Sequence, residues 1–189
     1  MRKFGAALVL AFLLGGASQA HASMFSLGAD MALSIHHPEF GDNTTIFGLP
    51  GATELFQPGF RFGIQPGAGT HELYLDTGLL SLSGGGDSFR ALVASANYQY
   101  NFSHAARTRP YLTAGFGLLN QHVSSSFGGS ASATSGIGGG GVGIRQWLAG
   151  DQGSLRFEAR YDRIGRSKHD EIGKAGVFSL KVGFDLWVK

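Results

Sequence analysis

Apolar and polar side chains alternate along most of the chain, with the period of two residues that a β-strand produces. The alternation is clearest in 178–188, where one parity carries six apolar residues and the other includes Ser179, Lys181 and Asp185. The preceding segment repeats the pattern, since Phe157 and Tyr161 alternate with charged neighbours. Each of these segments therefore predicts a strand with one apolar face and one polar or charged face.

Eight segments follow this alternation, and each is near the length that a tilted strand needs to cross a bilayer. They are Phe25–Ile35, Leu55–Gln65, Thr70–Ser81, Phe89–Phe102, Pro110–Val123, Gly138–Leu148, Leu155–Ile164 and Phe178–Val188. The pattern predicts an all-β fold, an eight-stranded antiparallel up-and-down transmembrane β-barrel with its apolar face toward lipid. A competing interpretation is a secreted soluble β-protein, whose apolar faces would meet a second sheet.

The first residues have the order of a secretory signal. Arg2 and Lys3 precede an apolar run, Phe4–Leu14, and Ala20-His21-Ala22 supplies a small-x-small cleavage site. We expect a signal peptide over 1–22, cleaved after Ala22, and a barrel domain over 23–189. Removing the two basic residues lowers Lys+Arg from 15 to 13, equal to the 13 Asp+Glu, so composition does not indicate nucleic-acid binding.

The connections between the strands alternate in length, as they do in outer-membrane barrels. We expect the longer outer loops at Pro38–Thr53, Ser124–Ser135 and Gly165–Gly176, the second being a Ser/Gly/Ala-rich loop without a packing role. Contacts with surface or host partners are expected in these loops. A girdle of interfacial aromatic residues is expected at the opposite ends, although strand parity turns the two tryptophans inward: Tyr100, Phe102, Tyr111, Trp147 and Trp187.

The charged parity of the strands defines the expected barrel interior. Its members are Asp30, Arg61, Glu72, Asp76, Arg145, Arg156, Glu158, Arg160, Asp162, Lys181 and Asp185. Eight strands enclose a space that side chains just fill, so we expect these groups to interlock through salt bridges and hydrogen bonds. The functional alternative is an ion path or proton relay through a narrow pore.

Three stretches resemble one known group of proteins. Pro110–Gly117, Gly139–Arg145 and Phe157–Tyr161 are similar to strands five to seven of the small eight-stranded outer-membrane barrels of Gram-negative bacteria. That group comprises the opacity-type porins and the transmembrane domain of outer-membrane protein A, and Phe178–Phe184 fits their last strand. The resemblance implies the outer membrane as location, with roles in envelope integrity, adhesion or host-surface contact.

The same resemblance implies two partners at the membrane. Outer-membrane lipid, including lipopolysaccharide, would surround the barrel, and the barrel assembly machinery would read its last strand. Members of the group usually end on an aromatic residue, whereas this chain ends Trp187-Val188-Lys189. Phe184, Leu186 and Val188 would then provide the recognition signal.

Candidate chemistry is sparse. There is no cysteine and no His-Glu-x-x-His motif, so neither a cofactor nor a metal is expected. The glycine run Gly136–Gly143 lacks the preceding strand and following helix of a nucleotide site. His122-Val123-Ser124 faintly resembles the His-x-Ser core of outer-membrane lipid A deacylases, which makes a hydrolase the enzymatic alternative. The preferred interpretation is a non-enzymatic barrel.

Overall fold

The computed structural model describes residues 23–38, 43–48, 59–67, 69–103, 106–125, 129–148, 152–165 and 174–188. The predicted signal peptide, 1–22, lies outside these residues. The described strands are β1 (Met24–Pro38), β2 (Thr44–Gly48), β3 (Gly59–Gln65), β4 (His71–Gly84), β5 (Asp87–Asn101), β6 (Thr108–Ser125), β7 (Gly129–Trp147), β8 (Gly153–Ile164) and β9 (Ala175–Val188). No helix in this part of the chain is long and apolar enough to span a bilayer.

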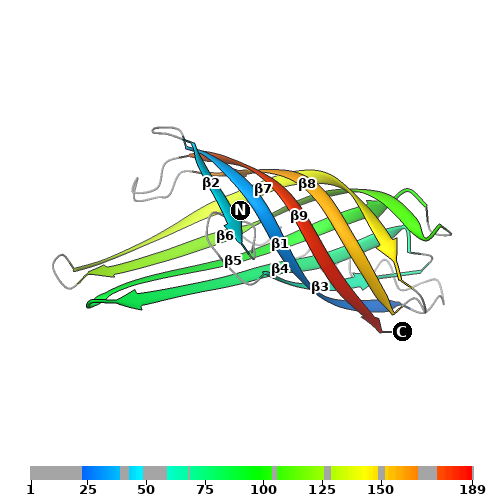
Figure 1. The fold of residues 1–189 in the computed structure, drawn as a ribbon, viewed down its shortest axis with the longest axis horizontal. Helices are drawn as coiled ribbons and strands as arrows, with labels where there is room; N and C mark the ends of the chain where they lie inside the picture. Colours follow the sequence, from blue (N-terminus) through cyan, green and yellow to red (C-terminus); the bar gives the residue numbers. More distant parts are fainter. Residues whose placement is uncertain are drawn as a thin grey trace, which may run out of the picture.

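The strands form one antiparallel sheet that closes on itself (Figure 1). Closure comes from the pairing of β1 with β9, which runs from Phe25 opposite Val188 to Pro38 opposite Ala175. β2 and β3 both pair with the other edge of β1, β2 along 32–36 and β3 along 24–30. They occupy one position in the wall, so the barrel has eight positions, and the predicted eight-stranded barrel is confirmed.

Two strand boundaries differ from the sequence-based prediction. β2 lies inside the segment expected to be a loop, where Thr44, Thr45, Ile46 and Phe47 supply the β-branched and aromatic residues that favour a strand. The Ser/Gly/Ala segment 124–135 was also predicted as a loop, and this prediction is wrong. β6 continues to Ser125 and β7 begins at Gly129, because ladder hydrogen bonds need no large side chains.

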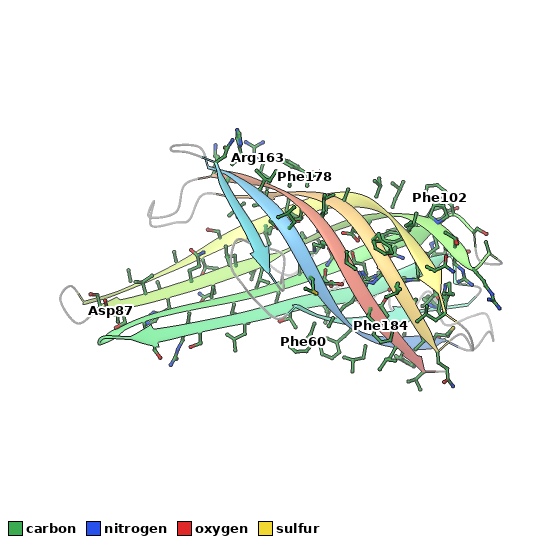
Figure 2. All side chains as sticks on the ribbon, viewed as in Figure 1. Phe60, Asp87, Phe102, Arg163, Phe178 and Phe184 are labelled. Carbon is green, nitrogen blue, oxygen red and sulfur yellow. The ribbon has the colours of Figure 1, made fainter. Side chains whose placement is uncertain are left out.

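The outer surface of the barrel is apolar, as the alternation predicts. Phe116 is 69% exposed, Leu118 60% and Leu79 58%, whereas the inward residues Glu72 and Arg145 are fully buried. Figure 2 shows Phe60 projecting outward from β3, and Phe178 and Phe184 projecting outward from β9. An exterior of large apolar side chains around a charged interior is the arrangement of a barrel embedded in lipid.

Four strands extend beyond the rest of the wall. β4 pairs with β3 only as far as Gly78, and β7 pairs with β8 only as far as Ile137. The segments beyond these points, 79–84, 87–93, 118–125 and 129–136, form a sheet that reaches past the barrel (Figure 1). We call these four segments the projecting sheet, and the end of the barrel that carries it the loop end. Both described termini, near Ser23 and Val188, lie at the opposite end, the terminus end.

The polarity of the wall reverses in the projecting sheet. Its inner face buries Ala91, Val93 and Leu119. Its outer face exposes Leu79, Leu92 and Leu118 at the positions nearest the barrel, but Arg90 and Ser132 farther out. A sheet in water buries its apolar face and exposes its polar face, the opposite of a sheet in lipid. The reversal therefore marks the level at which the lipid-facing part of the barrel ends.

This boundary makes a prediction for two outward positions of β7. Val142→Lys places a cation within the lipid-facing part and should lower the free energy of unfolding by about 2–4 kcal/mol. Ser132→Lys on the same face, above the boundary, should change it by less than about 0.5 kcal/mol. Urea titration of the barrel in phospholipid vesicles measures both, and equal costs for the two variants would contradict the assigned boundary.

Candidate functional site

The charged interior is the first candidate site. The structure places all eleven predicted interior charges on the inner face of the wall, none of them more than 6% exposed. Buried charges are costly unless they are paired and hydrogen-bonded, so the contacts of this set decide what it can do.

Near the terminus end, one carboxylate bridges two arginines. Glu72 Oε1 lies 2.7 Å from Arg61 Nη2, and Glu72 Oε2 lies 2.6 Å from Arg145 Nη1. Arg61 also donates to Gln99 Oε1 at 2.8 Å, and its guanidinium lies over the Tyr74 ring at 3.3 Å from the centroid. The group is held from four strands, β3, β4, β5 and β7.

In the middle of the barrel, Arg156 joins the two strands that close it. Its Nη2 lies 2.6 Å from Asp30 Oδ1 on β1, and its Nε lies 2.6 Å from Asp185 Oδ2 on β9. Farther toward the loop end, Arg160 Nε lies 2.7 Å from Asp162 Oδ2, and Arg160 Nη2 donates to Asn97 Oδ1 at 3.0 Å. These bonds link residues on β1, β5, β8 and β9.

Glycines on the inner face leave room for these long-range bonds. Gly183 stands opposite Asp30 on one side and opposite Arg156 on the other, so the Asp30–Arg156 bridge passes over it. A Cβ at Gly183 would meet Asp30 Oδ1 and Arg156 Nη2. In the same way, Gly143 stands between Tyr111 and Glu158, whose side chains hydrogen-bond across it at 3.0 Å.

Asp76 and Lys181 lie outside this set of short bonds. Asp76 Oδ1 has no hydrogen-bond partner among the described residues, and the positive charge of Lys181 acts on Asp76 electrostatically. The interior set has five cations and six carboxylates, so it carries one more acidic group than basic groups. Because Asp76 is on β4 and Lys181 is on β9, this pair adds a further electrostatic link across the barrel.

Two tryptophans close the barrel interior at the terminus end. The Trp147 and Trp187 rings are 5.0 Å apart, the Arg145 guanidinium lies 4.8 Å from the Trp187 centroid, and Trp187 Nε1 donates to Ser154 Oγ at 2.9 Å. Trp147, Trp187 and Tyr111 are nearly fully buried, so their assignment to the lipid-facing girdle is wrong. Trp187 and Tyr111 donate hydrogen bonds to Ser154 and Glu158, and Trp147 packs on Trp187. Tyr100 and Phe102 are exposed, as expected.

An apolar cluster closes the interior at the loop end. Its members are Val93, Leu119, Ile137, Ile164, Ala175 and Val177, contributed by β5, β6, β7, β8 and β9. This cluster was not predicted, because the inner parity was expected to be polar along the whole length of each strand. The signal was present, since Val93, Leu119 and Ile137 are apolar residues on the otherwise polar parity.

The proposed hydrolase pair lies elsewhere. His122 and Ser124 are on β6 within the projecting sheet, on the parity that faces away from the interior. The residues opposite His122 are Arg90 on β5 and Ser132 on β7, and neither is a carboxylate that could orient an imidazole base. Within the described residues, no group of three or more His, Cys, Asp or Glu side chains could hold a metal ion.

A closed wall of eight positions, an apolar exterior and a charged, side-chain-filled interior together define a small outer-membrane β-barrel. Comparison with solved structures agrees with this class. Neisserial surface protein A has a TM-score of 0.62 at 18% identity, with 86% of this chain and 96% of that chain covered.

Two further structures share the fold. The attachment invasion locus protein Ail of Yersinia pestis has a TM-score of 0.50 at 14% identity, covering 88% of this chain and 99% of that chain. The N-terminal barrel domain of Pseudomonas aeruginosa OprF has a TM-score of 0.50 at 16% identity, covering 89% and 100%. No family profile and no curated sequence matches the chain. At these identities the likeness establishes the fold.

The glycine between Asp30 and Arg156 gives a direct test of the interior network. Gly183→Ala should lower the free energy of unfolding by about 3 kcal/mol, because a buried charge pair is forced apart. Gly136→Ala on β7 is the matched control, since a Cβ there meets no atom within 4 Å. Urea unfolding in vesicles measures both, and an unchanged Gly183→Ala barrel would show that the bridge does not depend on the bare backbone.

Proposed function

We propose that the protein is a non-enzymatic barrel of the outer membrane, closed to ions, which presents a partner-binding surface at its loop end. The closure of the interior is the observation that carries this proposal. Trp147 and Trp187 fill one end, the apolar cluster fills the other, and salt bridges occupy the space between. An ion would have to displace all three layers, which favours a structural interior over a narrow pore.

The projecting sheet supports the second half of the proposal. Its outer face exposes small polar side chains and Arg90 above the lipid-facing part of the wall. A rigid sheet holds such a surface away from the membrane, where a partner can reach it. Two proteins with this fold, Neisserial surface protein A and the attachment invasion locus protein Ail, have names that fit such a surface role.

The proposal also includes the route to the membrane. The segment 1–22 would direct export and be removed after Ala22. The barrel assembly machinery would then insert the folding chain, reading the outward residues Phe184, Leu186 and Val188 of β9. All three are exposed on the lipid-facing side of the last strand, which makes them available to a partner before closure.

A closed interior predicts the absence of channel activity. The folded barrel should give no discrete current steps in planar phosphatidylcholine bilayers, because no continuous water path crosses the filled interior. Insertion is verified separately by heat-modifiable migration on gels, since a folded barrel keeps its shape in SDS until it is boiled. Reproducible unitary steps from verified, inserted protein would overturn the proposal in favour of the narrow pore.

The non-enzymatic assignment predicts that His122 and Ser124 have no role in lipid chemistry. Wild-type protein, His122→Ala and Ser124→Ala should leave the acyl-chain content of lipid A identical when each is incubated with it in detergent. Mass spectrometry of the lipid A measures this. Acyl-chain loss with the wild type that disappears in Ser124→Ala would instead establish a hydrolase.

A further inference from the structure

In the part of the wall that the structure describes, the outward-facing charges of the strands are basic. Within the described residues, every Asp and Glu lies inside the wall except Asp87, which stands at the tip of the projecting sheet (Figure 2). The exposed positions on the outer face include Arg90 and Arg163 together with His37. A surface with cations and without carboxylates attracts anions, and the anions at a membrane surface are lipid phosphates.

Two of these basic residues lie in one row across three neighbouring strands. Arg163 on β8 stands opposite Gly176 on β9, and Gly176 stands opposite His37 on β1. Neighbouring strands are about 4.8 Å apart, so the two basic residues lie about 10 Å apart, one on each side of Gly176. Tyr161 lies two residues before Arg163 on the same face, and its hydroxyl lies against Gly176.

The next outward-facing row toward the terminus end is apolar. Tyr161, Phe178 and Ile35 stand opposite one another on the same three strands and are 55%, 44% and 42% exposed. Figure 2 shows Arg163 and Phe178 next to each other at the loop end of the barrel. The basic row therefore lies one step above lipid-facing side chains, at the level where an acyl chain gives way to its head group.

We propose that Arg163, His37 and the Tyr161 hydroxyl form a binding site over Gly176 for the phosphate monoester of an outer-membrane lipid. Arg163 donates from its guanidinium, His37 from a ring N–H and Tyr161 from its hydroxyl, so the phosphate oxygens receive donors from three sides. The acyl chains of the same lipid pack on Phe178 and Ile35. The site adds specific lipid recognition to the proposed function and does not depend on whether the interior conducts.

Glycine is the residue that makes this geometry possible. A bare backbone at position 176 leaves room for the Tyr161 side chain, since a Cβ there would lie 2.5 Å from the Tyr161 hydroxyl and 3.1 Å from Tyr161 Cζ. A side chain at this position would therefore displace the hydroxyl from between the two basic residues. The second basic pair on the outer face, Arg90 and His122, stands directly opposite on adjacent strands and has no glycine between its members. That pair supplies charge at the loop end without the intervening strand and tyrosine hydroxyl of the Arg163–His37 row.

Lipid retention tests the proposal on the folded barrel. The protein is reconstituted in phosphatidylcholine nanodiscs with a minor fraction of phosphatidic acid, and native mass spectrometry counts the phosphatidic acid molecules that stay bound. Arg163→Gln should weaken retention about tenfold, the scale expected for loss of a charge-assisted bond. Gly176→Ala, which changes no charge, should weaken it about fivefold by displacing the Tyr161 hydroxyl. Arg90→Gln should change it by less than about twofold.

Three outcomes separate the alternatives. Phosphatidylglycerol, a phosphate diester, should be retained more weakly than phosphatidic acid, and millimolar inorganic phosphate should not displace the lipid. Displacement by inorganic phosphate would overturn the lipid assignment in favour of a free-phosphate site. Equal losses in Arg163→Gln and Arg90→Gln, or unchanged retention in both Arg163→Gln and Gly176→Ala, would overturn the site itself. Gel migration of each variant before boiling confirms that the barrel is folded.

Discussion

The pairing of β1 with β9 is the constraint on which the rest of the structure depends. A backbone in hydrocarbon cannot leave ladder hydrogen bonds unmade, so the sheet must close and have no free edge inside the membrane. Closure at eight positions fixes the circumference, and an eight-stranded wall encloses only enough space for side chains. The inner residues must therefore fill that space and satisfy one another, which is why charges and glycines share the inner face.

Filling such a space with charged side chains requires gaps as well as partners. Arg156 reaches Asp30 two strands away only because Gly183 between them has no side chain. Tyr111 reaches Glu158 over Gly143 by the same arrangement. The abundance of glycine in this chain, 31 of 189 residues, thus has a structural cause on the inner face. On the outer face at Gly176 the same absence of a side chain leaves room for the Tyr161 hydroxyl.

Sequence alternation predicted the barrel and the inward parity, because a strand directs successive side chains to opposite faces regardless of context. It failed where the environment changes along a strand. The tryptophans at 147 and 187 lie on the inner parity, but an expectation based on residue type assigned them to lipid. Val93, Leu119 and Ile137 show the reverse, since an apolar residue on a polar parity marks a closed end. Which acid pairs with which arginine depends on strand tilt and register, which alternation does not encode.

The interior charges also determine the register of the strands, which contacts with lipid do not. Lipid presents an almost uniform apolar surface to the outer face, so shifting a strand by two residues keeps its apolar side outward and costs little there. On the inner face the same shift would separate Arg145 from Glu72 and Arg156 from Asp185, leaving buried charges without partners. A one-residue shift is excluded by both faces, and a two-residue shift by the interior alone. The network of salt bridges thus selects one register of a wall whose exterior would accept several, and the positions of the loop-end surfaces follow from that register.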